Sequence, residues 1–443
     1  MDIAIKNIPF SVPPQLMRER LYKKSERPKI VLAVCPYDGE VIDRVTHQVY
    51  KPSAVKYMPL GLLSLASSIA DYEVSILDGA SRGMTVDEML EEIEALQPDI
   101  LGLSVVTYRA WAMQQILHRT TVPIKVVGGP HATENHAYIL QQGADAVFVG
   151  DAEETFPKWL KDGCPSGVIK GGPVDLDSIP YPNRKLVDLD DYRIESTKGL
   201  LFDVGNLRLP IYSSKGCPLK CIYCDVQQKK FYSMSPERIV DEFRQLKEVG
   251  ATSIHILDDA FNIQKDRVIK FCRLLIEDGL KIDWSVRGIV EVREEVVRAL
   301  AEAGCRRFHV GIEHLDDDVL SYFRKSHRYD HVQRFCKLCK KYGIDILGYF
   351  IIGAPGETAE YRDKLPDMIK ELGITIPYFN VLTPLSETIF YQQLLEDGTF
   401  AIDFWDEFSK KPEKNYEIPS HRTLEEEKEL QRVLASYIEI FNT

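Results

Sequence analysis

The chain has 443 residues, of which 44% are hydrophobic and 28% are charged, and its formal net charge is −12. This length suggests two to three domains, and this composition is typical of a globular protein with a sizeable core. Lysine and arginine form no long run, which argues against a nucleic-acid partner held mainly by phosphate contacts.

The N-terminal residues lack the charged-then-apolar pattern of a secretory signal, and no apolar stretch approaches the roughly 18 residues of a membrane helix. We therefore expect no integral membrane segment and a cytoplasmic location. The nine cysteines do not have the spacing of a disulfide scaffold. In a reducing compartment we expect them to be buried thiols or metal ligands.

The first half of the chain alternates between short apolar runs and helix-like stretches. Residues 1–28 are predicted to be a polar N-terminal arm, and the alternation fills 29–164. Strands that are apolar on both faces predict a parallel sheet covered on both sides, and five of them fit a doubly wound, flavodoxin-like domain. The expected strands cover 30–34, 74–77, 100–106, 125–127 and 146–149, and the expected helices 60–70, 86–96, 110–119, 137–142 and 153–160.

A second alternating series follows after 165–208, a segment whose prolines, glycines and acidic residues predict a linker. Over 209–400, six successive βα units predict a partial (βα)6, TIM-like barrel, in which ligands bind at the C-terminal ends of the strands. The expected strands cover 210–213, 253–257, 283–286, 307–312, 347–352 and 378–382, and the expected helices 236–249, 265–277, 294–303, 316–325, 329–342 and 359–372. Residues 401–443 form a charged C-terminal extension, in which Trp405 and Phe408 either line a cavity or pack in the core.

Three cysteines, Cys217, Cys221 and Cys224, are grouped directly after the first strand of the second series. Thiolates separated by three and then two residues can converge on one cluster of a soft metal when the loop wraps around it. A 4Fe-4S cluster takes four ligands, so a group of three leaves one iron open for a small molecule. The alternatives are a structural zinc site, which would need a fourth ligand, or cysteines that merely pack in the core. Core packing is expected for the cysteines away from strand ends, Cys305, Cys336 and Cys339.

This spacing, with Tyr223 before the third cysteine, resembles the signature of the radical S-adenosylmethionine (SAM) superfamily, and the likeness runs over about 210–400. The resemblance implies a 4Fe-4S cluster whose open iron binds the amino and carboxylate groups of SAM. An electron, supplied by an external reductant such as a flavodoxin or ferredoxin, would then break the S–C5′ bond of SAM. The resulting 5′-deoxyadenosyl radical would abstract a hydrogen atom from a small-molecule substrate.

Segments at the following strand ends are similar to those that hold SAM in this family. Asp258 and Asp259 could accept hydrogen bonds from the SAM ammonium group, or could cap a helix. Arg287 is suited to pair with the SAM carboxylate, and Glu313 stands where relatives face the ribose or the amino group. The strand that ends at Ile352 resembles the strand that flanks adenine. The resemblance thus implies SAM contacts at Tyr223, Asp258, Asp259, Arg287, Glu313 and Ile352.

Two segments beside these residues differ from the family pattern or are expected to have another role. His314 stands where relatives more often have serine, and it either faces the substrate or is a tolerated neighbour. Glu357 and Thr358 are expected to cap the helix that follows them.

Small residues follow three strands of the N-terminal series, within 104–108, 127–132 and 149–154. Small residues at successive strand ends leave a flat surface above the sheet, where a large ligand can lie. No Gly-x-Gly-x-x-Gly follows the first strand, which argues against a dinucleotide. Joined to the barrel, the domain resembles the cobalamin-binding domain of class B radical SAM enzymes. This implies cobalamin contacts at Thr107, Tyr108, Gly128, Gly129, Pro130, His131, Gly150, Asp151 and Glu153.

The loop Asp-x-His-x-x-Gly, whose histidine ligates cobalt in the wider cobalamin fold, is missing from the sequence. The resemblance therefore implies a base-off cobalamin without a protein histidine ligand. The alternative is a domain that keeps the fold without the cofactor.

Three functions remain compatible with the sequence. The first is a cobalamin-dependent radical SAM methyltransferase, in which one SAM methylates cob(I)alamin and a substrate radical, made with a second SAM, takes the methyl group from methylcobalamin. The second is a radical SAM enzyme that oxidises, cyclises or rearranges its substrate without methyl transfer. The third is a non-catalytic metal or electron-transfer module, which would not need Asp258, Arg287 and Glu313 at successive strand ends. No segment predicts the identity of the substrate.

Overall fold

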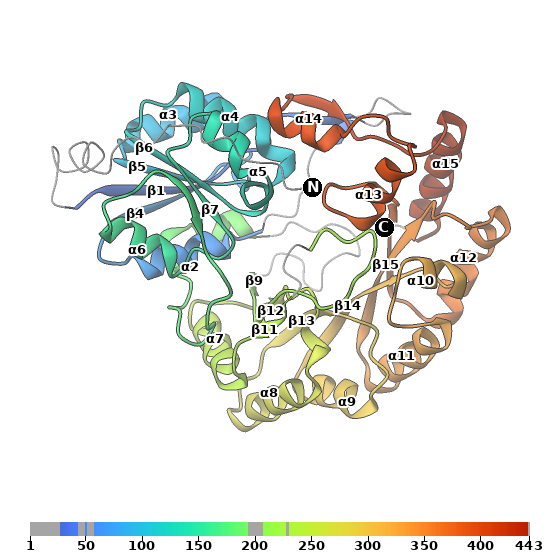
Figure 1. Cartoon of the computed structure of the whole chain (residues 1–443). Coiled ribbons are helices and arrows are strands. Elements are labelled where there is room, and N and C mark those ends of the chain that lie inside the picture. The colour runs from blue at the N-terminus through green and yellow to red at the C-terminus, as the bar shows by residue number, and fades with distance from the viewer. Residues whose placement is uncertain (1–26, 43–48, 51–56, 194–206, 227–229, 442–443) are drawn as a thin grey trace.

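The computed structural model describes residues 27–42, 49–50, 57–193, 207–226 and 230–441. It contains two six-stranded parallel sheets, one in each half of the chain, with helices packed against them (Figure 1). The expected N-terminal arm lies outside the described residues, apart from residues 27 and 28. In the part of the chain that the structure describes, no helix has the length and hydropathy needed to cross a membrane.

The first sheet has helices on both faces. Its strands are β1 (Lys29–Val34), β4 (Glu73–Asp78), β5 (Ile100–Ser104), β6 (Ile124–Gly128), β7 (Ala146–Val149) and β8 (Gly167–Lys170), and its helices are α2 (Leu60–Ser68), α3 (Val86–Leu96), α4 (Ala110–Arg119), α5 (Pro130–Gln141) and α6 (Thr155–Lys161). The strand order is β4-β1-β5-β6-β7-β8, so the first five strands have the flavodoxin-like arrangement. Val31 and Ala33 of β1 pack toward α3, α4 and α5, whereas Ile30 and Leu32 pack toward α2 and α6. Burial on both faces explains why this strand is a continuous apolar run.

Strand β8 lies in the segment that the sequence analysis assigned to the linker. It pairs with β7 over Gly167–Lys170 and adds a sixth strand at the edge of the sheet. With two apolar residues among four, and with Pro165 and Gly171 on either side, the segment has the local pattern of a loop. Its strand conformation therefore depends on pairing with β7 rather than on local propensity. Beyond it, the linker packs on the second domain through Val174, Leu176 and Ile179.

The second sheet is the predicted partial barrel. Its strands are β9 (Arg208–Ile211), β12 (Ser253–Ile256), β13 (Asp283–Gly288), β14 (Cys305–Glu313), β15 (Asp345–Ile352) and β16 (Ile376–Val381), and its helices are α7 (Pro236–Glu248), α8 (Lys265–Glu277), α9 (Glu294–Glu302), α10 (Asp317–Tyr322), α11 (Tyr329–Tyr342) and α12 (Ala359–Leu372). Each strand lies beside the next one in sequence, from β9 to β16, and all pairs are parallel. The helices cover the outer face of the sheet (Figure 1). The predicted fold class is confirmed for both halves of the chain.

The C-terminal extension joins the two domains. It contains α14 (Phe404–Lys410), β17 (Asn415–Glu417) and α15 (Leu424–Phe441), and it follows α13 (Ile389–Glu396). Strand β17 pairs with β2 (Glu40–Ile42) from the N-terminal half, and β2 pairs in turn with β3 (Val49–Tyr50). Trp405 and Phe408 are buried with Ala110 of α4 and Tyr391 of α13, so these aromatic residues pack between the domains.

Candidate functional site

The loop that carries the three grouped cysteines follows β9 at the C-terminal end of the barrel. A short hairpin, β10 (Ser214–Lys215) and β11 (Tyr232–Ser233), holds its base. The side chains of Cys217 and Cys224 are half-buried and that of Cys221 is 8% exposed. The other six cysteines are at most 3% exposed, and burial raises the pKa of Cys35 and of Cys336 to about 12. Two of the three grouped cysteines are thus partly exposed, whereas Cys305, Cys336 and Cys339 are core thiols as expected.

The chemistry of this donor set fits a cluster better than a single ion. A structural zinc site takes four ligands, whereas this loop offers three cysteines. A cluster of several irons is larger than one ion, and its thiolates stand further apart around it. Three thiols on one loop, without a fourth, therefore match a 4Fe-4S cluster with one open iron.

Asp258, directly after β12, anchors the start of this loop. One of its oxygens accepts hydrogen bonds from the backbone N–H groups of Ser213 and Ser214, at 2.7 and 3.0 Å. The other accepts from the two serine hydroxyls, both at 2.6 Å. Arg267 of α8 adds a hydrogen bond of 2.6 Å from Nη2 to the Ser213 carbonyl. Because Asp258 is fully buried and its oxygens already accept four bonds, we propose that it positions the cysteine loop, whereas the exposed Asp259 is the carboxylate that can face a ligand.

Glu313 and Tyr223 lie together at the end of β14. The Lys325 ammonium is 3.4 Å from the Glu313 carboxylate and 3.2 Å from the Tyr223 hydroxyl. Glu313 has a left-handed backbone, with φ of 68°, and its side chain folds over Gly311, where an added Cβ would come within 2.3 Å of Glu313 Oε1. Burial, and then the charge of Glu313, raises the pKa of Tyr223 well above its ordinary value. A strained backbone of this kind is typical of sites where one side chain must be held in place.

Among the described residues, Arg287 keeps an unused hydrogen-bond donor, whereas Ile352 is a core residue. Arg287 Nη2 donates to the Leu257 carbonyl at 3.1 Å, while its buried Nε has no partner in the described part of the chain, which leaves capacity for an acidic group. Ile352 is fully buried in the main core. Its neighbour Ile351 packs with Ile222 of the cysteine loop and is therefore the side chain of this strand that faces the site.

His314 and Glu357 belong to a buried network directly after β14 and β15. His314 stacks on Tyr361 at 4.0 Å between ring centroids, and its Nε2 is 3.3 Å from Glu357. Glu357 also accepts a hydrogen bond from Gly353 N and pairs with Arg362 at 3.0 Å. His314 is thus a packing residue rather than one that faces a substrate. Thr358 caps α12 through Tyr361 N, as predicted.

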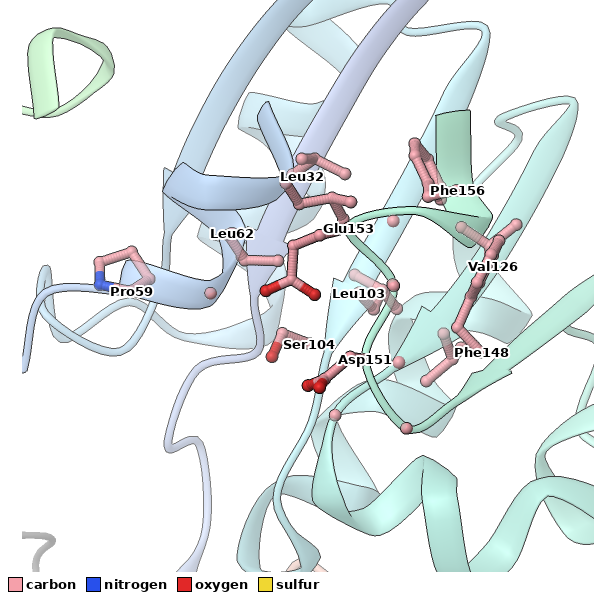
Figure 2. A pocket seen from close by; sticks show the side chains of 18 of the residues that line it. Leu32, Pro59, Leu62, Leu103, Ser104, Val126, Phe148, Asp151, Glu153 and Phe156 are labelled. Carbon is pink, nitrogen blue, oxygen red and sulfur yellow. The ribbon is translucent and has the colours of Figure 1, made fainter. Parts of the chain in front are cut away.

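A cavity of about 230 Å³ opens at the C-terminal edge of the N-terminal sheet (Figure 2). Its floor is apolar and includes Leu32, Leu103 and Phe156, whereas Asp151 and Glu153 add carboxylates (Figure 2). Five glycines contribute to its lining: Gly61, Gly102, Gly128, Gly129 and Gly150. A cavity of this size holds one arm of a large ligand rather than the whole of it.

Glycine is required at particular points of this wall. A Cβ at Gly129, where φ is 98°, would come within 2.8 Å of the Val105 carbonyl oxygen, and a Cβ at Gly102 would come within 2.8 Å of Leu32 Cδ2. These positions keep the sheet edge flat and the cavity open. The residues present therefore fit a large cofactor such as cobalamin, because the glycines leave the sheet edge flat and the cavity has room for one part of such a ligand.

The predicted cobalamin residues fall into two groups. Gly128, Gly129, Gly150, Asp151 and Glu153 line the cavity. The others lie outside its lining: Thr107, Tyr108, Pro130 and His131. His131 is 1% exposed, its Nδ1 is 3.2 Å from Asn135 Nδ2, and burial lowers its pKa to about 4. We infer that His131 is a neutral residue that supports the loop.

Lys215 connects the cavity to the cysteine loop, and the sequence analysis did not single it out. Its ammonium is 2.8 Å from Asp151 and 3.0 Å from Glu153, and Tyr232 also donates to Asp151. Burial alone would lower the pKa of Lys215, but the two carboxylates more than offset this and raise it. Lys215 lines the cavity and precedes Cys217 by two positions, so the two candidate sites share one wall. No motif marks such a pair, because its members are more than 60 positions apart in the sequence.

Comparisons with known proteins agree with this arrangement. The model of the "Radical SAM superfamily" matches residues 211–369 and that of the "B12 binding domain" matches residues 50–160. The "Uncharacterized methyltransferase PH0819" of Pyrococcus horikoshii is 30% identical over 383 residues, which cover 79% of this chain and 81% of that protein. This chain belongs to the radical SAM superfamily. It is a radical SAM enzyme with a cobalamin-binding domain, and its cofactors are a 4Fe-4S cluster, SAM and cobalamin.

More distant relatives share the architecture. The "Anaerobic magnesium-protoporphyrin IX monomethyl ester cyclase" of Rubrivivax gelatinosus is 26% identical over 361 residues, which cover 75% of this chain and 64% of that protein. The solved structure of the radical SAM methyltransferase TsrM from Kitasatospora setae, with cobalamin and a [4Fe-4S] cluster bound, matches with a TM-score of 0.63 at 19% identity. The match covers 84% of this chain and 75% of TsrM, and it shows a shared fold.

Proposed function

We propose that this radical SAM enzyme is a cobalamin-dependent methyltransferase that acts on an unactivated centre of a small molecule. The observation that carries the proposal is the contact of Lys215 with Asp151 and Glu153, at 2.8 and 3.0 Å. It joins the wall of the N-terminal cavity to the loop of Cys217. Methyl transfer between two cofactors requires that both face one substrate space, and this contact fixes the two sites next to each other. The relatives PH0819 and TsrM, both named as methyltransferases, support the same function.

When bound, the cluster and SAM would supply a 5′-deoxyadenosyl radical, and cobalamin would supply a methyl group. Cys217, Cys221 and Cys224 would hold the cluster. Arg287 and Glu313 would orient the carboxylate and the amino or ribose groups of SAM, because both are charged and fixed at strand ends. In the other domain, the glycines of the cavity would make room for cobalamin, and Asp151 and Glu153 would border it.

We further propose the following division of the chain: an arm (1–28), a cobalamin-binding domain (29–164, to which β8 adds an edge strand), a linker (165–208), a radical SAM domain (209–400) and a C-terminal extension (401–443). The enzyme would take its electrons from an external reductant such as a flavodoxin or ferredoxin.

A second candidate is radical chemistry without methyl transfer. The similarity to the protoporphyrin ester cyclase of Rubrivivax gelatinosus favours it, because that relative spans both domains and is named for a cyclisation. The residues described so far are compatible with both reactions, so the products must decide between them.

The deciding experiment needs no substrate. Full-length protein would be reconstituted anaerobically with iron, sulfide and cobalamin, then incubated with SAM and a chemical reductant. We expect 5′-deoxyadenosine and, in addition, S-adenosylhomocysteine in an amount equal to the bound cobalamin. 5′-Deoxyadenosine without cobalamin-dependent S-adenosylhomocysteine would favour the second candidate. Neither product would exclude both.

A Lys215→Met variant tests the shared wall. Removing the ammonium leaves Asp151 and Glu153 facing each other without a counter-charge, so the cavity wall and the cysteine loop should separate. We expect S-adenosylhomocysteine formation to fall by about 10- to 100-fold. Lys265→Met, which removes an exposed ion pair with Glu295, is the matched control and should have no effect. Equal rates in the two variants would contradict the role of Lys215.

A further inference from the structure

The inner face of the barrel sheet carries polar side chains. Ile254, Val286 and Phe308 belong to the same buried core as apolar residues of the helices α7, α8 and α9. Because side chains alternate along a strand, their neighbours His255, Ser285 and His309 face the barrel interior. The contacts agree: the rings of His255 and His309 are 4.6 Å apart between centroids, and His255 Nδ1 is 2.6 Å from Ser285 Oγ. Both histidines are 5% exposed.

Positive charge surrounds these histidines. Burial, and then the charges of Arg208, Arg307 and Arg287, holds the pKa of His309 well below its ordinary value. Burial, and then His309 and the nearby arginines, has the same effect on His255. The two imidazoles are therefore neutral at pH 7. The charged groups nearest to them in the barrel interior, which we call the lumen, are arginine guanidinium groups. Arg307 pairs with Asp345 at 3.4 Å, but neither Arg208 nor Arg287 forms an ion pair with a described carboxylate.

Hydrogen-bond donors in the lumen are buried and unused. Arg208 Nη1 and His309 Nε2 have no partner among the described residues. Tyr349 lies 3.4 Å from His309 Nδ1, and burial raises the pKa of Tyr349 to about 12, so its phenol stays neutral and can donate to that nitrogen. His309 then carries its own hydrogen on Nε2, the nitrogen that has no partner among the described residues. Leaving such buried donors unpaired is unfavourable, unless a ligand satisfies them.

We propose that the lumen cluster, formed by Arg208, His255, His309 and Tyr349, binds an acidic group, a carboxylate or a phosphate, of the enzyme's substrate. An anion is the ligand that would use both the excess positive charge and the unused donors. His309 precedes Glu313 on β14 by four residues, or about 13 Å. The lumen cluster therefore lies deeper in the barrel than the strand ends at which SAM is expected to bind. Arg287 would then serve the SAM carboxylate, and Arg208 with His309 would hold the substrate. The inference rests on the proposed radical chemistry for what happens to the substrate, but not for the binding.

The test is a titration with two simple anions. Reconstituted full-length protein would be titrated calorimetrically with inorganic phosphate and, separately, with succinate, each with and without saturating SAM. We expect one of the two to bind at a single saturable site whose affinity SAM does not weaken, and the stronger probe identifies the acidic group. In buffers of different ionisation enthalpy, binding should take up protons, because a bound anion raises the pKa of the neighbouring histidine.

Three variants locate the site. Arg208→Gln and His309→Gln should each weaken binding of the probe by about tenfold or more, and His309→Gln should also reduce the proton uptake. Arg208→Lys, which keeps the charge but not the fork of donors, should recover part of the affinity. Arg306→Gln is the matched control, because Arg306 lies on the same strand as His309 but is half-exposed and pairs with Asp283 at 2.8 Å. Circular dichroism and the visible absorbance of the cluster establish that each variant is folded.

Three results would overturn the inference: no saturable binding of either anion, equal affinity in the parent and in Arg208→Gln, or displacement of the anion by SAM. The last result would assign the lumen cluster to SAM itself. Formation of 5′-deoxyadenosine by the parent protein, measured in parallel, reports on the proposed function separately. A failure of one proposal can therefore be told from a failure of the other.

Discussion

The two sheet edges that face each other in this enzyme are built on different principles. The edge of the N-terminal sheet is open: glycines line it, its floor is apolar, and added side chains at Gly102 or Gly129 would collide with the wall. The edge of the barrel carries charged side chains that are held by hydrogen bonds. Asp258 accepts them from Ser213 and Ser214, and Lys325 contacts both Glu313 and Tyr223. The difference indicates that a bulky cofactor needs space cleared for it, whereas a small charged one needs fixed partners. A substitution at one edge should therefore impair the cofactor of that edge and leave the cofactor of the other edge bound.

The largest effect is expected for Cys217→Ala. Losing one of three thiolates removes the cluster, so formation of 5′-deoxyadenosine should fall to background. Cobalamin binding, which depends on the other edge, should stay within twofold of the parent. Product analysis by mass spectrometry and cobalamin content by absorbance would check the two halves of this prediction. Simultaneous loss of cobalamin would mean that the edges are not independent.

Asp258→Asn tests whether the barrel edge depends on a held loop. An amide offers one acceptor where the carboxylate offers two, so hydrogen bonds from Ser213 and Ser214 are lost at a cost of about 3 kcal/mol. We expect cluster occupancy and 5′-deoxyadenosine formation to fall by about 10- to 100-fold. Asp283→Asn, at an exposed pair with Arg306, is the control. Iron content per chain and initial rates measure the effect, and an unchanged iron content in Asp258→Asn would contradict it.

Gly61→Leu tests whether the other edge depends on space. Gly61 of α2 lines the cavity, and an added Cβ there meets no atom within 4 Å, so the variant should fold as well as the parent. The longer side chain would enter the cavity and should weaken cobalamin binding by about tenfold, since overpacking costs roughly 1–3 kcal/mol. The control is Gly172→Leu, a position outside the cavity that is equally free of neighbours. Equilibrium dialysis would measure both, and equal affinities would argue against the cavity as the binding site.

A smaller, pH-dependent effect is expected where the domains meet. Burial, and then the nearby Glu387, raises the pKa of Glu134 on α5 from 4.5 to about 7. The folded state therefore holds a proton that the unfolded state releases, and the stability it gives is present below about pH 4.5 and lost as pH rises through about 7. Glu134→Gln should raise the melting temperature by about 2 °C at pH 8, and the gain should shrink toward pH 5. Thermal scans of this variant beside Glu94→Gln, an exposed control, would show whether the gain is pH-dependent.

Much of the fold was predictable because its signals are local. The expected bounds of α3, α8, α11 and α12 agree with the structure, since each has a clear apolar stripe. A strand at residues 167–170 was not predicted, because it exists through pairing with β7. The pairing of β17 with β2 was likewise not predicted, since two three-residue strands far apart in sequence carry no signal of their own.

The candidate site shows the same limit. The three cysteines and the glycine-rich strand ends could be found from spacing, but the partners of each side chain could not. Asp258 was expected to meet SAM, yet its oxygens are committed to Ser213 and Ser214. Lys215 and the lumen residues Arg208 and His309 were not selected at all, because a single cation or histidine in a strand has no motif around it. Their significance comes from what the fold places beside them.

The parallel pairing of β17 with β2 has a consequence for how the enzyme is assembled during synthesis. Domains fold largely in the order in which they leave the ribosome, so the N-terminal sheet and the barrel can each form before Asn415–Glu417 is available. This strand, followed by α15, which packs on the barrel core, is then added after the two sheets. The pairing of β17 with β2 therefore connects the two halves of the chain after both sheets have formed.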